Sequence, residues 1–529
     1  MNDESTLPAP SLSTREQFVP LLLGLLAIMA VVVNIEPFPV GVYQDDGIYT
    51  VLAKSLATGQ GFRYLHLPDA PNATHYPPLY PLFLAGLWKA FPSFPANITL
   101  FKFANAAFLG VAAFMAWRFA RRQVGMTHWS AVISAGAFTI CAPLVLHAVM
   151  VLSESMFLAA LFPVLIACER AARTGDRRDA LIAGAAAGAL ALVRTIGAVA
   201  IPATALTLAI RKRWVPAALV WVAGLAVMLP WQLWIATYDS QLPDVFLGRY
   251  GSYGGWLMSG IREGGIAWIG QLIVFNLDEL SDGMSLLLTV DHLPVAIRWL
   301  GTLAIAGFFA GGWLKMLRRA PVAAWTVAIY LAVIISWPFE PPRFIFAVWP
   351  VIGMIMGLSV HAVLTWRPAP GMRFRVMQVA GVTMAAGLVL GYARYNYVGV
   401  ANRWWSQTQA FVANRSRPMA EWVVANTPSD AVIATDDDVL MHLYTGRRTV
   451  PNFTFTPQEY MTPQTRPFER ETLRKIVRMY DVDYLLTASE NGIRAANGLV
   501  QANPPEAQVI HVFKYGAVFR ILQRTSEGQ

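Results

Sequence analysis

The chain has 529 residues, of which 56% are hydrophobic and only 14% are charged. Soluble domains carry roughly 25% charged residues, so this composition excludes a soluble protein and indicates a membrane protein with several spans. The net charge is +9, and the two cysteines, Cys141 and Cys168, lie in apolar stretches, which excludes a disulfide framework.

Hydropathy predicts about eleven membrane spans. They cover residues 18–35, 99–118, 129–147, 152–169, 180–193, 196–210, 214–236, 294–314, 322–338, 344–364 and 376–397. The fifth and sixth are short and rich in alanine and glycine. No small-residue cleavage site follows the first span, so the polar start, Met1–Glu16, is expected to remain in the cytoplasm.

Positive charges fall in every second loop between these segments. The loops hold Arg118, Arg121 and Arg122; Arg170, Arg173, Arg177 and Arg178; Arg211, Lys212 and Arg213; Lys315, Arg318 and Arg319; and Arg367, Arg373 and Arg375. Cytoplasmic loops carry such an excess. We therefore expect a multi-pass protein of a bacterial inner (plasma) membrane with a cytoplasmic N-terminus. The external face then receives the loops 36–98 and 237–293, two short turns and the C-terminal tail.

The two long external loops contain apolar residues at helical spacing and many aromatic residues. Tryptophan and tyrosine favour the boundary between membrane and water. We interpret both loops as helices that lie on the outer membrane face. A proline-rich stretch from His75 to Pro81 introduces the second helix of the first loop.

From about residue 400 the long apolar stretches stop and charged residues become frequent. The pattern predicts helices at 418–426, 438–444 and 469–480, and strands at 431–435, 482–487, 508–515 and 517–523. The predicted fold is therefore mostly α: a transmembrane helical bundle over 1–399, with interfacial helices, followed by a small extracytoplasmic α/β domain over 400–529.

Two adjacent carboxylates, Asp45 and Asp46, stand where the first span leaves the membrane. An amphipathic helix follows them, so they lie at a helix N-terminus, where the helix dipole favours negative charge. Position alone allows two interpretations. The pair could simply cap the helix, or Asp45 could act as a catalytic base.

Three further ionisable groups are predicted at the same external face. Glu154 lies at a short turn before the fourth span, Arg194 between the fifth and sixth spans, and Arg343 at the start of the tenth. Charged groups at membrane depth are costly and are functional candidates. Each also has a structural interpretation, as a helix cap, an ion-pair partner or a headgroup anchor. The run Asp436–Asp438 is interpreted as a solvated helix N-terminus rather than a metal site.

Several of these stretches resemble motifs of the GT-C glycosyltransferases, and in particular of the protein O-mannosyltransferases and bacterial lipid A aminoarabinose transferases. The stretch from Tyr43 to Leu56 resembles the first external loop of those enzymes, in which an Asp-Glu pair opens a helix. The other matching stretches are His75-Tyr-Pro77-Pro78, which resembles a Lys-Pro-Pro motif, the second acidic motif at Glu154, an arginine turn at Arg194, and Arg343-Phe-Ile-Phe-Ala-Val-Trp-Pro350, which resembles Arg-Tyr-Leu-Leu-Pro.

Two residues depart from the family pattern. Asp46 replaces the glutamate of the acidic pair. Tyr76 stands where the aminoarabinose branch has a lysine that is thought to contact the donor phosphate. This second change puts the aminoarabinose acceptor class in doubt and assigns phosphate binding to other cations.

The resemblance implies inverting transfer of a sugar from a polyprenyl-phosphate donor to a hydroxyl of a lipid, glycan or protein acceptor. Asp45 is then the catalytic base. The expected substrate-binding residues are Asp46, Lys54, His75, Tyr76, Glu154, Arg194 and Arg343. Guanidinium groups suit a phosphate leaving group. No nucleotide-binding motif is present, and no nucleic-acid partner is expected.

Other interpretations remain open from the sequence. Two nearby carboxylates could hold a divalent cation, although the histidines show no metal-ligand spacing. A polytopic transporter or lipid-sugar flippase is the alternative function, but transporters place ionisable residues near the bilayer midplane, often in repeated halves. A non-catalytic assembly protein is the third.

Overall fold

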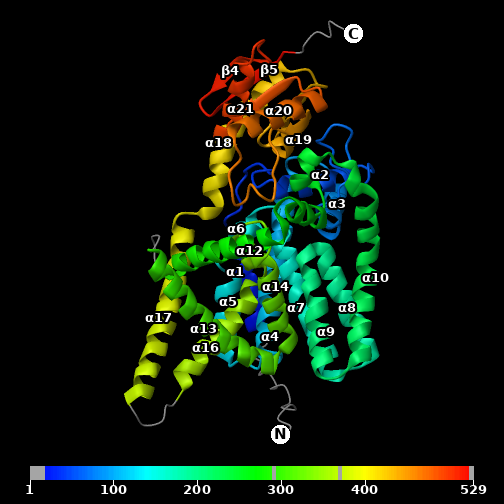
Figure 1. The fold of residues 1–529 in the computed structure, drawn as a ribbon. Helices are drawn as coiled ribbons and strands as arrows, with labels where there is room; N and C mark the ends of the chain where they lie inside the picture. Colours follow the sequence, from blue (N-terminus) through cyan, green and yellow to red (C-terminus); the bar gives the residue numbers. More distant parts are fainter. Residues whose placement is uncertain (1–17, 289–293, 367–371, 523–529) are drawn as a thin grey trace.

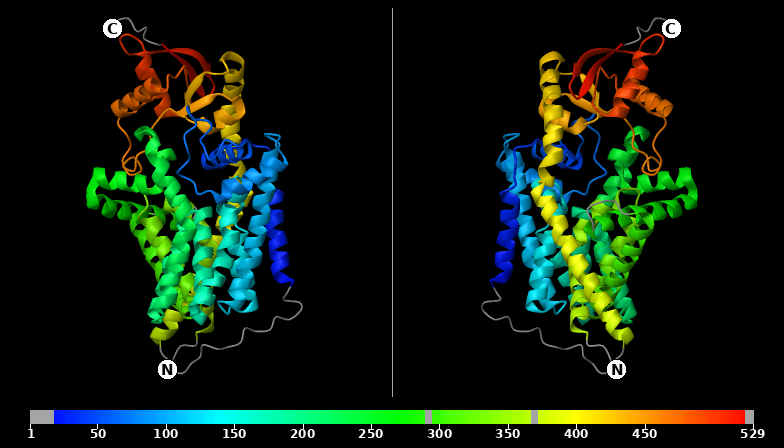
Figure 2. Two further views of the ribbon diagram at one scale, coloured as in Figure 1. Left: turned by 90° about the vertical axis from the view of Figure 1, so that its right-hand side faces the viewer. Right: turned by 90° about the vertical axis from the view of Figure 1, so that its left-hand side faces the viewer.

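The computed structural model describes residues 18–288, 294–366 and 372–522. Long helices form a bundle, and a small mixed sheet with its own helices stands at one end of it (Figure 1). The side views show the sheet at the same end from both directions (Figure 2). The predicted cytoplasmic start, Met1–Glu16, and Arg367 lie outside the described residues.

Each of the predicted spans contains a helix. These helices are α1 (Val19–Val32), α4 (Asn97–Arg122), α5 (His128–Thr139) with α6 (Ala142–Val149), α7 (Glu154–Thr174), α8 (Arg177–Val193), α9 (Ala200–Ile210), α10 (Trp214–Tyr238), α13 (Val295–Arg319), α14 (Pro321–Ile335), α16 (Trp349–Thr365) and α17 (Met372–Ala401). The mostly helical class is confirmed.

The described residues contain more helices than segments that are long and apolar enough to span a membrane. In the described part of the chain, six helical segments are long and apolar enough to cross a membrane, or seven if α5 and α6, bent by 48°, form one span. Three shorter apolar helices add to these, namely α1, α14 and the segment Thr195–Ile210. The count of eleven therefore stays a prediction.

The weakest predicted segments are stabilised by close packing of small residues. In α8, Gly184 and Gly188 form a GxxxG motif that faces α10. A Cβ atom on Gly188 would lie 2.6 Å from the carbonyl oxygen of Gly224, so only glycine permits this approach. In a membrane, helices associate through such van der Waals contact rather than through the hydrophobic effect.

The loops predicted to be external also contain helices. These are α2 (Asp45–Ala57), α3 (Leu79–Ala90), α11 (Leu247–Tyr250), α12 (Tyr253–Leu288) and α15 (Pro341–Phe344), with short 3₁₀ turns η3 (Asp239–Gln241) and η4 (Asp244–Phe246). Two further 3₁₀ turns, η2 (Thr195–Val199) and η5 (Ile345–Val348), come directly before α9 and α16. Helix α12 lies across the bundle rather than along it (Figure 1). It is interrupted at Gly265, where φ is +67°.

The C-terminal part begins with α18 (Trp404–Asn426) and contains a five-stranded sheet in the order β2-β1-β3-β5-β4. Strand β1 (Val432–Thr435) pairs in parallel with β2 (Arg448–Pro451) and β3 (Tyr484–Thr487), while β4 (Ala507–Phe513) and β5 (Gly516–Ile521) form an antiparallel hairpin. Helices α19 (Asp438–Thr445), α20 (Arg466–Met479) and α21 (Glu490–Val500) complete it.

The sequence patterns located most of this sheet but missed β2 and α21. The helix predicted at 438–444 is confirmed as α19, which is followed by Gly446 in the left-handed conformation with φ +70°. Consecutive parallel strands β1 and β2 are joined through α19, so the residues after β1 and β2 emerge at the same edge of the sheet.

We predict that Gly188→Leu prevents stable packing of α8 on α10. Overpacking of a well-packed contact typically costs about 1–3 kcal/mol, and more where the neighbour is backbone that cannot move aside. The measurement is the yield of monodisperse protein on size exclusion in detergent. Gly307→Leu in α13 is the control, because a Cβ there meets no described atom within 4 Å. Equal yields of the two variants would contradict the packing account.

Candidate active site

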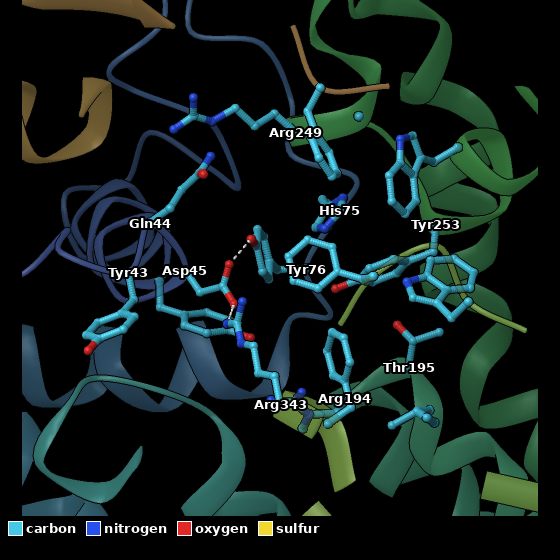
Figure 3. Close-up of a pocket in the computed structure, with 18 of the residues that line it drawn as sticks. Tyr43, Gln44, Asp45, His75, Tyr76, Arg194, Thr195, Arg249, Tyr253 and Arg343 are labelled. Carbon is cyan, nitrogen blue, oxygen red and sulfur yellow. Dashed lines mark hydrogen bonds and ion pairs between the residues drawn. The ribbon is translucent and has the colours of Figure 1, made fainter. Parts of the chain in front are cut away.

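A large cavity lies between the helical bundle and the C-terminal sheet. Its volume is about 680 Å³. Its walls come from the start of α2, the stretch 75–77, η2, α11, the start of α12, the end of α14, the stretch 337–344 and the edge of the sheet at 437–439, 453 and 455. The predicted residues that line it are Asp45, His75, Tyr76, Arg194 and Arg343 (Figure 3).

A tight turn aims Asp45 into this cavity. The backbone N–H of Asp45 donates to the carbonyl oxygen of Tyr43 at 2.6 Å, and Gln44 between them has φ +58° and ψ −57°. These angles define a classic γ-turn, which is rare and strained for a residue other than glycine. Gln44 occupies the N-cap of α2 and makes no side-chain cap. The carboxylates therefore do not serve as the helix cap that position alone allowed.

Both oxygens of the Asp45 carboxylate have a partner. The phenol of Tyr76 donates to Oδ1 at 2.6 Å, and a guanidinium nitrogen of Arg343 forms an ion pair with Oδ2. Figure 3 shows these two groups meeting the carboxylate from different sides. Burial and the neighbouring Asp45 raise the pKa of Tyr76 well above its usual value, so the phenol stays protonated and can donate.

His75 is fixed beside this pair. Its Nδ1 lies 2.5 Å from the carbonyl oxygen of Gly251 and acts as the donor there, which leaves Nε2 as the acceptor nitrogen. Its ring packs against Tyr253, with centroids 4.2 Å apart. Burial lowers the pKa of His75, so the imidazole is neutral at physiological pH.

Asp46 and Lys54 do not line the cavity. The Asp46 carboxylate turns back into its own loop, where it accepts hydrogen bonds from the backbone N–H groups of Gly41 at 2.8 Å and Tyr43 at 3.0 Å. Burial raises the pKa of Asp46 to about 6. Lys54 lies in the last turn of α2, and partial burial lowers its pKa.

Glu154 and Arg194 form a second ion pair beneath the cavity. Arg194 Nη1 lies 2.7 Å from Glu154 Oε1 and also donates to the Ser153 hydroxyl at 3.0 Å. Glu154 is 2% exposed, whereas Arg194 reaches the cavity wall. Glu154 is therefore the ion-pair partner of a nearby cation, which is one of the structural interpretations that the sequence allowed.

Arg249 is a cavity residue that sequence reasoning missed. It comes from α11 and forms an ion pair with Asp438 at 3.2 Å. The run Asp436–Asp438 does stand at a helix N-terminus, since α19 begins at Asp438. The expectation that it is solvated is wrong, because Asp438 is 0% exposed and Asp436 accepts hydrogen bonds from Asn452, Thr487 and Ser489. The edge of the sheet that carries these aspartates faces the bundle rather than water.

Aromatic side chains form the opposite wall. Trp256 stacks on Phe455, with centroids 5.5 Å apart, and packs on Trp337 at 5.7 Å. The Arg343 guanidinium lies 5.7 Å from the ring centroid of Phe339 and 5.8 Å from that of Phe344. The cavity thus joins an apolar surface to a cluster of charges, which suits an amphiphilic ligand.

The carboxylates of this site do not form a metal-binding set. Within the described ranges, no three His, Cys, Asp or Glu side chains are grouped to hold a metal ion. Asp45 and Glu154 each face an arginine, and Asp46 faces backbone amides. The described carboxylates therefore do not converge on one point.

We predict that Glu154→Gln destabilises the protein strongly, because it leaves Arg194 as a buried charge without its counterion, at a cost of about 3–5 kcal/mol. The melting temperature in detergent measures this. Glu490→Gln is the control, since that carboxylate pairs with Arg494 while 91% exposed, and surface pairs contribute about 0–1 kcal/mol. Similar melting temperatures for both variants would show that the inner pair is not a structural element.

No protein-family model matches the sequence, and no curated protein matches it by sequence. The structure of ArnT from Cupriavidus metallidurans bound to undecaprenyl phosphate aligns over 98% of this chain and 100% of its own, with a TM-score of 0.59 and 15% identity. The apo state of that protein aligns over 96% and 98%, with a TM-score of 0.52 and 14% identity.

Arabinofuranosyltransferase AftD from Mycobacteria aligns over 98% of this chain and 42% of its own, with a TM-score of 0.43 and 14% identity. ArnT is a lipid A aminoarabinose transferase, one of the two branches whose motifs the sequence resembles. The alignment with both ArnT structures covers nearly all of this chain, including the C-terminal sheet domain. The chain therefore has the same fold as ArnT, which is the fold expected from the resemblance to the GT-C glycosyltransferases.

Proposed function

We propose that the protein is an inverting glycosyltransferase that moves a sugar from a polyprenyl-phosphate donor to a hydroxyl of an acceptor at the extracytoplasmic membrane face. The observation that carries this proposal is the cavity in which Asp45 meets Tyr76 and Arg343, with Arg194 in the same wall. A carboxylate, two guanidinium groups and an aromatic wall in one cavity match the needs of this reaction.

The donor phosphate lies at Arg343 and Arg194 in this proposal. A guanidinium carries five N–H donors, so Arg343 can keep Asp45 on one nitrogen and bind phosphate oxygens with the others. The aromatic residues beside Arg343 offer an apolar surface to the first part of the lipid chain. The similar structure of ArnT bound to undecaprenyl phosphate supports a lipid phosphate as ligand.

The chemical step is a single displacement at the anomeric carbon. The acceptor oxygen forms a bond to that carbon while the bond from the carbon to the phosphate oxygen breaks. The acceptor proton passes to Asp45, and the electron pair leaves with the lipid phosphate, whose charge Arg343 and Arg194 stabilise. One displacement inverts the configuration. Tyr76 and Arg343 hold the carboxylate in place, and each of its oxygens keeps a further lone pair for the acceptor hydroxyl.

The neighbouring residues orient the sugar. The neutral His75 presents Nε2 as an acceptor for a sugar hydroxyl, and Tyr253 stacks beside it. Tyr76 occupies the position of the family lysine, and here it orients the base instead of binding phosphate. The acceptor is a lipid, a glycan or a protein. The alternation of positive loops supports an external position for the cavity.

We predict that Asp45→Asn lowers the rate of transfer by about two to four orders of magnitude, since the amide cannot accept the proton. The measurement is mass spectrometry of cell-envelope glycans and lipids with and without the variant, followed by turnover of the purified protein. Asp69→Asn is the control, because Asp69 is an exposed aspartate of the same external loop.

Near-wild-type turnover of Asp45→Asn would refute the assignment of the base. Passage of a sugar-lipid across sealed vesicles without a new glycosidic bond would instead favour the flippase. Correct folding of the variant is verified by its size-exclusion profile, so that loss of activity is not confused with loss of protein.

A further inference from the structure

The C-terminal domain packs directly on the loops that form the cavity. The backbone N–H of Val40, just before the acidic turn, donates to the Tyr444 hydroxyl at 3.1 Å. A Cβ atom on Gly248 in α11 would lie 1.8 Å from the carbonyl oxygen of Phe455, so only glycine allows this contact. These contacts bring the edge of the sheet against α11. Arg249, which follows Gly248 in the chain, therefore lies between α11 and the sheet.

Arg249 is anchored at one nitrogen only. Its Nη2 binds Asp438 Oδ1 at 3.2 Å and the carbonyl oxygen of Asp436 at 3.4 Å. Asp438 also accepts a hydrogen bond from the Tyr250 hydroxyl, which lies 3.0 Å from His66 Nε2. Asp438, Tyr250 and His66 are each 0% exposed. Burial lowers the pKa of His66 well below its usual value, so Arg249 is the charged partner of Asp438.

The other two nitrogens of this guanidinium have no partner among the described residues. Nε and Nη1 are buried and make no hydrogen bond within that part of the chain. The Arg249 side chain is 10% exposed, lines the cavity and lies 4.7 Å from the ring centroid of Phe453. Leaving buried donors on a charged group unpaired is costly. An oxyanion at the Nη1–Nη2 end of the guanidinium would satisfy the Nη1 donor.

Arg249 stands apart from the donor-phosphate residues. Figure 3 shows Arg249 on one side of Asp45, whereas Arg343 and Arg194 lie on the other side. In a displacement with inversion, the acceptor approaches the sugar from the face opposite the leaving phosphate. A cation beyond the base, away from Arg343, is therefore on the acceptor side.

We propose that Arg249, held by Asp438 of the C-terminal domain, is a second anion-binding subsite that takes a phosphate or carboxylate group of the acceptor. The inference rests on the proposed function, whose acceptor class it narrows to anionic molecules. The C-terminal domain contributes the anchor, so the subsite exists only while that domain is docked on α11.

The test compares two kinds of ligand on the purified full-length protein. Undecaprenyl phosphate probes the donor side. Glucose 6-phosphate and glucuronic acid, each compared with neutral methyl glucoside, probe the acceptor side in the presence of saturating undecaprenyl phosphate. We expect the anionic sugars to bind at least about tenfold more tightly than the neutral one, as expected for charge-assisted hydrogen bonds. Whichever of the two anionic sugars binds more tightly identifies phosphate or carboxylate as the preferred group.

We expect Arg249→Gln to remove the preference for anionic sugars while undecaprenyl phosphate affinity stays within about threefold. Arg343→Gln should do the reverse. Arg262→Gln is the matched control, because Arg262 is exposed on α12 of the same loop and outside the cavity lining. Should Arg249→Gln fold poorly with Asp438 unpaired, the double variant Arg249→Gln with Asp438→Asn removes both charges together and should lose the same preference.

Two results would overturn the inference. One is equal binding of anionic and neutral sugars by the wild-type protein. The other is loss of undecaprenyl phosphate affinity in Arg249→Gln as large as in Arg343→Gln, which would assign Arg249 to the donor phosphate. Failure of the proposed function has a different signature, namely no glycosidic product from the wild-type protein, and these binding measurements do not depend on it.

Discussion

The ion pair between Asp45 and Arg343 is the interaction on which the rest of the structure depends. The two residues are 298 positions apart in the chain. The pair therefore forms only when the start of α2, in the first predicted external loop, packs against α15. The γ-turn at Gln44, the Tyr76 hydrogen bond and the aromatic neighbours of Arg343 all hold this pair in one geometry. These contacts together form the wall of the cavity, and no single sequence motif would produce it.

The same arrangement recurs three times around the cavity. Asp45 pairs with Arg343, Glu154 with Arg194, and Asp438 with Arg249. Each pair balances charges that would be expensive to bury alone. Because a guanidinium has more donors than one carboxylate can use, each arginine that lines the cavity retains capacity for a ligand oxyanion. The resting site is therefore electrically balanced and still able to receive phosphate.

Much of the fold could be predicted from the sequence, because hydropathy and helical spacing are local properties. The helices within the predicted spans and most of the sheet follow from such patterns. The sequence motifs identified Asp45 and Arg343 as candidate site residues. Lys54 was a poor candidate on geometry alone: it follows Asp45 by nine residues, and at about 100° per residue the two side chains point to opposite sides of α2. Arg249 carried no local signal, since its partner Asp438 is 189 positions away.

The most direct test of the account is an experimental structure of the protein with undecaprenyl phosphate. We predict the phosphate within hydrogen-bond distance of the Arg343 guanidinium, on the same side of Asp45 as Arg194, with the Asp45 carboxylate still facing the cavity. A phosphate bound outside this cavity, or at Arg249 with Arg343 uninvolved, would contradict the assignment of donor and base.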